Sequence, residues 1–574
     1  MKKTLIAFAV AAAFASAASA ASFKAGTYTA TAPGIHGDVT VEVTFTADKL
    51  ADIKVTKQSE TVGIGSKAVE LLPGRMVAAQ SPAVDGVTGA TITTEAIRKA
   101  VSDCVKQAGV DPANLVPLAV KKTGGQKTLE TDMVVVGGGG SGMSATIRGR
   151  MNGMNVILVE KMPYIGGAAA ISGGQVVAQG SKLQKAFGST EDSPESMIKD
   201  FMANGHNLND PAKISLYANN VGATIDWLHE KVGVKFIPND LPFLAEYSHR
   251  RALEFEGGAK TMAQHLREVI AGNGAQVLYS TRVEKLLQDK DGRVIGVEAT
   301  DDNGVKYTIK STLYYGPVSS TGDGHRMAME LGAKTQLMQY GKRYPNGIEV
   351  APGKAKSTIY ANVGAFDQAG ILVNIDGKRF VNEKASNRHI LDPMLQNANG
   401  QGYVFMDQKS WEGFYKRLPE TGVSHEDADK YLAQDGKTAP LFVKGATVEE
   451  VAAKAGINAA ALKATVARYN GFVKAKKDAD FDRPVQYMKA EISAEGPYYI
   501  VEQRPRFATT MGGLCTNDKL NVITKDGKLI PGLYAAGELV GGVMGDDSPA
   551  GANVGWALTS GRVAADAIKE AVAK

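Results

Sequence analysis

Cysteine is nearly absent from the sequence: only Cys104 and Cys515 occur among 574 residues. A disulfide framework is therefore excluded as the means of holding the fold together. Neither cysteine lies in a Cys-x-x-Cys-His motif, which excludes covalently attached haem. Any redox function must use another carrier, and we predict no metal site.

Long hydrophobic runs and strong charge are lacking as well. Beyond the leader described below, no stretch approaches the roughly 20 apolar residues of a transmembrane helix. The formal net charge of +5 falls to +3 once the leader with its two lysines is removed, which is too weak to indicate a nucleic acid or an acidic membrane surface as a partner. We expect neither nucleic-acid binding nor stable membrane insertion.

Residues 1–20 have the pattern of a secretory signal peptide. Two lysines precede an apolar stretch too short to span a membrane comfortably, and Ala18-Ser19-Ala20 offers a small-residue cleavage site. No cysteine follows that site, which argues against a lipid anchor. The pattern predicts an exported protein, located in the periplasm if the source is Gram-negative.

The length predicts at least three domains, because 574 residues are too many for one hydrophobic core. In residues 21–118, the alternation over 38–45 and the turn after it predict an antiparallel hairpin. Apolar residues at helical spacing follow, with Cys104 expected in the core. These features indicate a small α+β domain, and the polar residues 119–130 are interpreted as a linker.

A Gly-rich turn follows a buried-strand run that ends at Val136. Gly137, Gly139 and Gly142 have G-x-G-x-x-G spacing, and a helix and a second strand ending before Glu160 come after them. This order is that of a dinucleotide-binding βαβ unit, in which helix N–H groups approach a pyrophosphate and the acid binds ribose hydroxyls. The alternative is a purely structural Gly-rich turn.

The chain closes with a strand, a second Gly-rich turn and a helix, over residues 531–572. Two nucleotide-contacting segments so far apart imply that one domain is interrupted by another, inserted between about 342 and 506. FAD is large enough to need both segments.

Several further motifs occur in a fixed order after Thr131: GGAAAISGG, STGDGHRMAMELGA, GILVNIDGKRFVNE, TTMGGL and PGLYAAGELVGGV. With them the chain resembles the fumarate reductase flavoprotein family, specifically its soluble exported members, which include urocanate reductases. The resemblance implies an α/β fold: a Rossmann-like FAD-binding domain (131–341 and 507–574) interrupted by an α+β capping domain (342–506). It also implies noncovalent FAD, held by Gly137, Gly139, Gly142, Glu160, Gly166, Gly167, Glu538, Gly551 and Asn553.

The segment DGVTGAT, Asp85 to Thr91, matches the D-G-x-[ST]-G-A-T signature of the FMN-binding domain that often precedes such reductases. The resemblance implies covalent FMN on Thr91 through a phosphoester, attached by a flavin transferase. In the other interpretation, which is compatible with the first, Thr93 or Thr94 caps a helix that begins near Glu95. Two flavins suggest that a membrane-associated quinol-oxidising cytochrome reduces FMN, which then reduces FAD.

Reduction of an activated C=C bond needs a hydride, a proton and groups that polarise a carboxylate or carbonyl. In the family, an Arg after GKRF-x-NE donates the proton, and Arg388 is the matching candidate although the spacing is shifted by about one residue. His389 is a rival donor, and Arg379 within GKRF is expected to make structural bonds.

Tyr344 takes the place of a substrate-binding His of fumarate reductases, as in urocanate reductases, which also have an Asp where Asp367 stands. Tyr344, Asp367 and Arg388 are thus interpreted as anchor, proton relay and donor. Interdomain packing for Tyr344 and a turn role for Asp367 are the alternatives.

Three departures from the family bear on the substrate. Thr509 and a residue near Ser548 occupy places where fumarate reductases carry a His and an Arg, and this loss of cations disfavours fumarate. The usual Ala-Thr-Gly-Gly strand and longer stretch before TGDG are not found, which puts the FAD-facing wall in doubt.

The sequence therefore favours a reductase of an α,β-unsaturated carboxylate in anaerobic respiration, urocanate-like first, with acrylate, methacrylate, hydroxycinnamate and fumarate open. A ketosteroid-dehydrogenase-like flavoenzyme and a non-catalytic flavin electron carrier are the alternatives.

Overall fold

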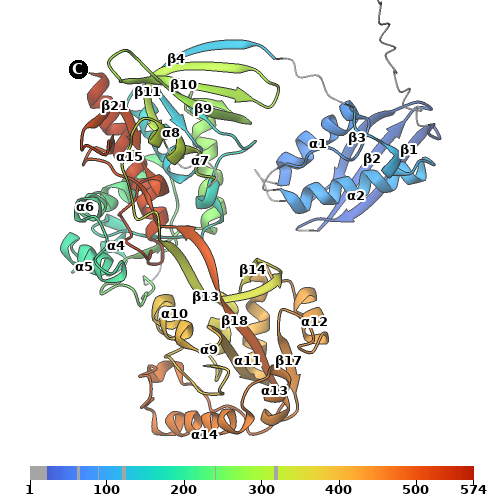
Figure 1. Cartoon of the computed structure of the whole chain (residues 1–574), viewed down its shortest axis with the longest axis vertical. Coiled ribbons are helices and arrows are strands. Elements are labelled where there is room, and N and C mark those ends of the chain that lie inside the picture. Colours follow the sequence, from blue (N-terminus) through green and yellow to red (C-terminus); the bar gives the residue numbers. More distant parts are fainter. Residues whose placement is uncertain are drawn as a thin grey trace, which may run out of the picture.

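The computed structural model describes residues 22–573 apart from 36, 61–64, 88–89, 119–123, 239–240 and 316–320, and without the side chains of Thr91 and residues 312–315. The predicted signal peptide lies outside the described residues. The buried apolar side chains form separate cores over residues 23–115, over 133–333 together with 511–568, and over 348–501. Figure 1 shows the corresponding three bodies.

The N-terminal body is a three-stranded antiparallel sheet covered by two helices. Its elements are β1 (Gly26–Pro33), β2 (Asp38–Phe45), β3 (Leu50–Lys57), α1 (Gly65–Ala79), α2 (Thr91–Gln107) and the short η1 (Pro112–Asn114). The predicted hairpin is confirmed as β2 and β3, with the valines of β2 facing the helices. Cys104 is buried in α2, as predicted, and burial raises the pKa of its thiol to about 11.

The threonines after the flavin signature do not cap a helix. Helix α2 already begins at Thr91, and its N-cap residue, Ala90, has no side chain that could cap it. The Thr94 hydroxyl instead accepts a hydrogen bond from the Val87 amide at 3.2 Å, and the Thr93 hydroxyl donates to Glu60. The capping interpretation of Thr93 and Thr94 is therefore wrong, because their hydroxyls stabilise the preceding turn and a neighbouring segment.

The second body is built on an eight-stranded sheet. Its main order is β20-β21-β11-β4-β5-β8, and β10 pairs with β11 and β9. The strands are β4 (Gln126–Val136), β5 (Val156–Val159), β8 (Gln276–Leu278), β9 (Thr281–Gln288), β10 (Val294–Asp301), β11 (Lys306–Tyr315), β20 (Asn521–Ile523) and β21 (Leu529–Ala535). The parallel strands β4 and β5, joined by α3 (Gly140–Met151), confirm the predicted βαβ unit.

The strand expected to be missing before TGDG is present as β11. It pairs in parallel with β4 on one side and with β21 on the other, so it occupies the middle of the sheet. The sequence KYTIKSTLYY lacks the Ala-Thr-Gly-Gly signature, but its backbone completes both ladders. The doubt about a missing strand was wrong, whereas residues 316–320 lie outside the described part.

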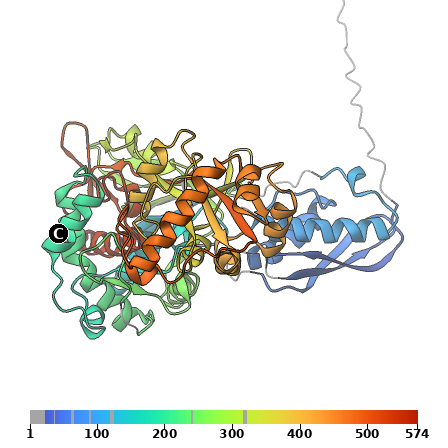
Figure 2. The ribbon, with the colours of Figure 1, turned by 90° about the horizontal axis from the view of Figure 1, so that it is seen from below.

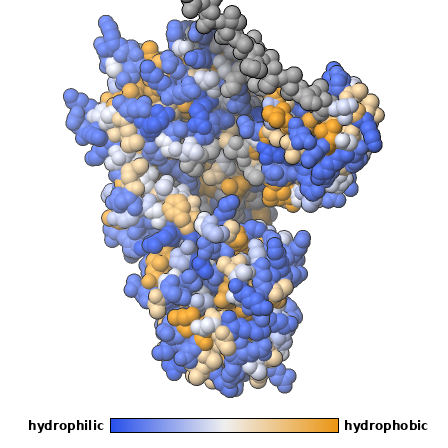
Figure 3. Space-filling view, turned by 45° about the vertical axis from the view of Figure 1, so that its right-hand side comes forward, coloured by the Kyte–Doolittle hydropathy of each residue, from blue (hydrophilic) through white to orange (hydrophobic). Residues whose placement is uncertain are grey.

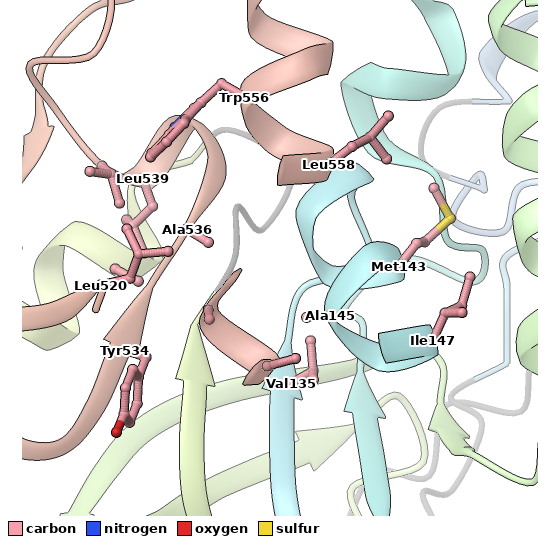
Figure 4. Close-up of a cluster of buried hydrophobic side chains, with 14 of the residues drawn as sticks. Val135, Met143, Ala145, Ile147, Leu520, Tyr534, Ala536, Leu539, Trp556 and Leu558 are labelled. Carbon is pink, nitrogen blue, oxygen red and sulfur yellow. The ribbon is translucent and has the colours of Figure 1, made fainter. Parts of the chain in front are cut away.

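Helices pack on this sheet, and α15 (Ala552–Val572) packs closely on α3. The Ser144 hydroxyl donates to the Leu558 carbonyl at 2.6 Å, and Arg148 pairs with Asp566 at 2.6 Å. Figure 4 shows Met143 of α3 near Leu558 of α15, in the buried cluster that also includes Val135 of β4. The remaining elements are η2 (Gly167–Ile171), β6 (Gln175–Val177), α4 (Lys182–Ala186), α5 (Pro194–Asn204), α6 (Pro211–Trp227), η3 (Leu228–Val232), β7 (Ala252–Glu254), α7 (Gly258–Gly272), α8 (Asp323–Glu330), β12 (Thr335–Gln336), β19 (Gly513–Leu514) and η6 (Gly537–Leu539).

The third body is inserted into the second. Its sheet has the order β14-β13-β18-β16-β15, with β17 also on β18. The strands are β13 (Gly341–Ala351), β14 (Lys354–Ser357), β15 (Ile371–Val373), β16 (Gly402–Asp407), β17 (Phe442–Gly445) and β18 (Tyr498–Thr510); the helices are α9 (Ile359–Phe366), α10 (Asn387–Gln396), α11 (Gln408–Arg417), η4 (Leu418–Thr421), α12 (His425–Ala433), α13 (Val448–Ala455), α14 (Ala459–Ala475) and η5 (Val485–Tyr487). The antiparallel strands β13 and β18 run from the second body into the third (Figure 1). Together the sheets and helices confirm the predicted α/β fold with an inserted α+β unit.

The N-terminal body lies to one side of the second body in both ribbon views (Figures 1 and 2). Arg75 of α1 pairs with Asp302, after β10, at 3.4 Å across this contact. In Figure 3 the visible surface is mainly hydrophilic, with hydrophobic residues in small groups. Among the described residues, none of the helices combines the length and the apolar character needed to cross a membrane.

Candidate cofactor and active site

The first predicted nucleotide segment forms a turn that has no room for side chains. Gly137 has a φ of 93°, and a Cβ on Gly142 would lie 1.9 Å from the Gly137 carbonyl oxygen. Helix α3 follows, and its N-cap residue, Gly139, makes no side-chain cap. The Ser141 hydroxyl is buried there and has no hydrogen-bond partner among the described residues. Free N–H groups and an orphaned hydroxyl at a helix N-terminus fit a pyrophosphate.

Glu160 is buried at the end of β5, beside this turn. Its carboxylate accepts hydrogen bonds from the Gly138 amide at 2.6 Å and the Met162 amide at 2.8 Å, and burial raises its pKa. Since each carboxylate oxygen has a second lone pair, Glu160 can still accept bonds from ribose hydroxyls. The carboxylate is thus held by the backbone where the βαβ pattern expects it.

The predicted glycines 166 and 167 lie against the same turn. The Gly166 amide donates to the Gly138 carbonyl at 2.7 Å, and a Cβ on Gly167 would lie 3.1 Å from Gly139 Cα. Both residues have positive φ angles, 135° and 50°. The two glycine segments therefore form one cradle from which side chains are excluded.

The C-terminal segment adds a second helix N-terminus and an acid that lacks a protein partner. Gly551, with φ of 75°, precedes α15 and provides no side-chain cap, while the Asn553 side-chain amide donates to the Ser548 hydroxyl at 3.2 Å. Glu538 is partly exposed, its partial burial raises the pKa of its carboxyl, and none of the described residues forms a hydrogen bond or ion pair with its carboxylate. A carboxylate of this kind fits a site that is completed by a hydroxyl-bearing cofactor such as FAD.

Glu538 also lines a cavity of about 510 Å³ between the second body and the base of β18. His325 lies in the same lining, and its Nε2 atom is buried without a partner among the described residues. The sequence analysis assigned a role to Glu538 but none to His325, although His325 lies within the family motif STGDGHRMAMELGA. The glycines of the cradle leave room for a nucleotide, and the full set of residues predicted to hold FAD stays a prediction.

The flavin signature of the N-terminal body faces the second body. Gly86 and Val87, within the signature, line a cavity of about 330 Å³ together with Arg75, Lys161 and Arg282. Thr91, the predicted attachment point, is the first residue of α2, and its side chain lies outside the described part. Gly86 and Val87 of the signature thus lie at the contact between the two bodies.

The catalytic candidates Tyr344 and Arg388 lie where the third body meets the C-terminal Gly-rich turn, residues 541–551; we call this region the junction. Tyr344 is in β13, burial raises its pKa, and its ring lies beside Lys342 and Arg506, with cation-to-centroid distances of 4.8 and 4.5 Å. Lys342 in turn pairs with Asp547 of the turn. Tyr344 is therefore held between two cations, a stabilising arrangement for a tyrosine ring.

Arg388, in the first turn of α10, contacts the same Gly-rich turn. Its Nε donates to Asp392 at 3.0 Å, and its terminal nitrogen lies 3.8 Å from the Asp546 carboxylate. Asp546 also bonds the partly exposed His206 ring at 2.8 Å. The chain His206–Asp546–Arg388 thus runs from the surface to the candidate donor.

Asp367 and His389 have other partners. The Asp367 carboxylate, at the end of α9, accepts a bond from Lys384 at 2.8 Å, and within the described residues no contact joins it to Arg388 or Tyr344. His389 Nδ1 lies 2.7 Å from the hydroxyl of Ser386, which caps the same helix. The structure therefore brings together two of the three catalytic candidates.

Arg379 makes structural bonds, as the sequence suggested. Its guanidinium binds Glu383 through two bonds of 2.8 Å and Asp478 through another of 2.8 Å. Arg483 pairs with the same Glu383 at 3.2 Å, and all four side chains are buried. This network fixes the segment that leads to Arg388.

A cavity of about 600 Å³ opens between the third body and residues 243–246 of the second. Its lining includes Glu246, Asn346, Lys384 and Asn387. Burial raises the pKa of Glu246, and the neighbouring Lys342 opposes this shift. The size suits a small organic substrate.

Sequence reasoning missed Lys342, Arg506, Asp546 and Asp547. The pair of acids inside a Gly-rich turn was a usable signal, because adjacent carboxylates in a buried turn need cationic partners. Arg506 carried no such signal, since its neighbours are brought to it only by the pairing of β13 with β18.

Comparison with known proteins agrees with this geometry. The FAD binding domain model matches residues 132–313 and 308–554, and the FMN-binding domain model matches residues 34–106. The chain is 31% identical to the urocanate reductase of Eggerthella lenta, over 95% of this chain and 93% of that protein. It is 31% identical to the fumarate reductase (cytochrome) of Shewanella frigidimarina, over 79% and 81%.

Among solved structures, the open conformation of a flavocytochrome c3 fumarate reductase superimposes with a TM-score of 0.60 at 27% identity, covering 78% of this chain and 79% of that one. The match over most of the chain and the glycine cradle lead to the same assignment. The chain belongs to the FAD-binding flavoproteins of the fumarate and urocanate reductase type, with an FMN-binding domain ahead of the FAD-binding domain.

Proposed function

We propose that this protein reduces the C=C bond of an α,β-unsaturated carboxylate, with a urocanate-like acid as the favoured substrate. The similarity to a urocanate reductase over nearly the full length of both chains is the observation that carries the proposal. Tyr344 supports it, because a tyrosine stands where fumarate reductases carry a substrate-binding His. Acrylate, methacrylate, hydroxycinnamate and fumarate are the other substrates to be tested.

FAD would be held by the cradle of glycines 137–142 and 166–167, by Glu160, and by Glu538 with the N-terminus of α15. When bound, FAD supplies the hydride for the reduction. The chain's own part is to orient the substrate, exclude water at the junction and supply the proton.

Arg388 is proposed as the proton donor and Tyr344 as the group that orients the substrate. A guanidinium is a weak acid. It therefore needs a neighbouring group that holds it in place and reprotonates it after it has given its proton to the substrate. Asp546 lies 3.8 Å from Arg388 and bonds the partly exposed His206, which suits that task. Asp367, the relay suggested by the family, would act through Lys384, with which it is bonded.

Electrons are proposed to enter at the N-terminal body, through FMN esterified to Thr91 by a flavin transferase. The position of the signature at the contact with the second body supports transfer between the two. Export to the periplasm and a membrane-associated quinol-oxidising cytochrome as donor would make this the terminal step of an anaerobic respiratory chain.

The test is an anaerobic assay of the purified holoenzyme with dithionite-reduced methyl viologen and a panel of enoates. We expect rapid dye oxidation with urocanate, and a loss of about 10²–10⁴-fold in kcat for Arg388→Ala, the usual contribution of a general acid. Lys409→Ala, an exposed residue of α11, is the control and should behave as wild type. Dye oxidation by no enoate would overturn the proposal in favour of an electron carrier, and oxidation of a 3-ketosteroid instead would favour the steroid dehydrogenase alternative.

A further inference from the structure

Arg506 is a cation of the junction that differs from its neighbours in its partners. It lies in β18 directly opposite Tyr344 of β13, and its guanidinium stacks 4.5 Å from the centroid of the Tyr344 ring. Directly opposed residues of antiparallel strands project from the same face of the sheet. Arg506 therefore points to the face on which Tyr344 meets the Gly-rich turn.

The other junction cations are already neutralised. Lys342 pairs with Asp547, Arg388 lies between Asp392 and Asp546, and Lys384 pairs with Asp367, each within 4.0 Å. Within the described residues, no carboxylate lies that close to Arg506. A cation that is largely removed from water is stabilised when an anion pairs with it.

The hydrogen bonds of Arg506 are few and long. Its Nε donates to the Asn346 carbonyl at 3.3 Å and a terminal nitrogen donates to the Asn346 side-chain oxygen at 3.4 Å. Bonds of this length are weak. Burial lowers the pKa of Arg506, which is the direction expected for a cation without a counter-ion.

We infer that Arg506, the junction cation without a carboxylate partner among the described residues, binds the carboxylate of the substrate and thereby selects monocarboxylates. The inference rests on the proposed reductase function and names the group that recognises its substrate. A guanidinium presents two parallel N–H donors that match a carboxylate, and stacking on Tyr344 holds that fork in one plane.

The hydrogen bonds around Arg506 connect the proposed carboxylate site with the segment of the proposed proton donor. The Asn346 amide donates to the Asn387 side chain at 2.9 Å, and Asn387 precedes the proposed donor Arg388. Asn346 and Asn387 both line the 600 Å³ cavity. Arg506 and Arg388 are not themselves among the residues that line this cavity, so a carboxylate on Arg506 would be linked to the donor segment through Asn346 and Asn387.

A second carboxylate has no cation of its own. Thr509 and a residue near Ser548 occupy the places where fumarate reductases carry a His and an Arg, and neither Thr509 nor Ser548 is charged. The charge balance therefore admits one negative charge from the substrate. Dicarboxylates such as fumarate and succinate should bind weakly.

The experiment is isothermal titration of the oxidised holoenzyme with urocanate, propionate and succinate, alongside steady-state kinetics. The variants are Arg506→Lys and Arg506→Gln, and the matched control is Arg343→Gln, an exposed arginine of β13. For Arg506→Gln we expect a Kd and KM for urocanate raised about 10- to 100-fold, the loss of one charged hydrogen-bonding partner. Arg506→Lys should recover part of this loss, kcat should change less than KM, and Arg343→Gln should match wild type.

The binding arm separates this inference from the proposed function. If wild type binds monocarboxylates but reduces none, the reductase function fails and Arg506 is judged by the Kd values alone. An unchanged Kd in Arg506→Gln, succinate binding as tightly as urocanate, or no monocarboxylate binding to wild type at all would each overturn the inference.

Discussion

The Lys342–Asp547 pair gives the sharpest stability prediction for this fold. The two side chains are only 6% and 7% exposed, and Lys342 also donates to the Ser548 carbonyl at 2.9 Å. The pair joins β13 to the Gly-rich turn that precedes α15. Lys342→Met would keep most of the stem volume but leave the Asp547 carboxylate buried without its cation.

Breaking a buried pair from one side costs about 3–5 kcal/mol, whereas replacing both partners by apolar residues is often close to neutral. With a urea dependence of about 3 kcal/mol/M, at the upper end for small proteins, the single change should lower the midpoint by about 1–1.7 M. Lys342→Met with Asp547→Leu should recover at least half of that shift. The recovery separates the cost of an orphaned charge from the cost of lost packing.

The assay is FAD retention after equilibration in urea, measured as flavin that passes an ultrafiltration membrane. FMN that is esterified to Thr91, as proposed above, would not pass the membrane, and the readout would then report the FAD-binding domain alone. Lys444→Met, a lysine of β17 far from the turn in sequence, is the control and should retain FAD as wild type does. If Lys342→Met leaves the midpoint unchanged, or if the double variant is worse than either single one, the argument from charge burial is refuted.

Two further predictions follow from single residues. Thr91→Val should remove the flavin adduct, whose mass is that of FMN less water, from the tryptic peptide Met76–Arg98 of the exported protein. Thr93→Val should leave that adduct in place. An adduct that persists in Thr91→Val would contradict the attachment site. Burial raises the pKa of Glu246, so its protonated form contributes stability that is complete below the ordinary Glu value of about 4.3 and is lost as pH rises through the raised value. Glu246→Gln should therefore gain stability relative to wild type as pH rises from about 4.3 to the raised value and keep that gain above it, measured as FAD-release midpoints across pH, and a pH-independent difference would contradict this.

The parts of the fold that could be predicted depend on local spacing. The βαβ unit around Gly137 and the hairpin of β2 and β3 are specified by patterns within about thirty residues, so the sequence was enough for both. The start of α2 was not, because the Thr93 and Thr94 hydroxyls bond to Glu60 and to the Val87 backbone instead of capping the helix. Choosing between such partners requires the tertiary structure.

Strand β11 shows the opposite error. Its sequence lacks the family signature, yet its backbone is held on one edge by β4 and on the other by β21. A central parallel strand needs backbone groups that complete two ladders more than it needs particular side chains. Comparison with the family's sequence signature therefore failed to predict a strand that the pairing of its backbone is enough to form.

The substrate site depends most on non-local geometry. Arg506 and Tyr344 belong to segments separated by the whole inserted domain, and they become neighbours only through the register of β18 on β13. The Gly-rich turn then brings Asp546 and Asp547 to Arg388 and Lys342, which neutralises those two cations and leaves Arg506. The family's His and Arg are replaced by Thr509 on β18 and by a residue near Ser548 in the Gly-rich turn, which removes two positive charges, while Arg506 on β18 supplies one. A protein that keeps the glycine cradle for FAD can in this way change the net charge of the substrate that it accepts. The change needs exchanges of residues on two strands and one turn.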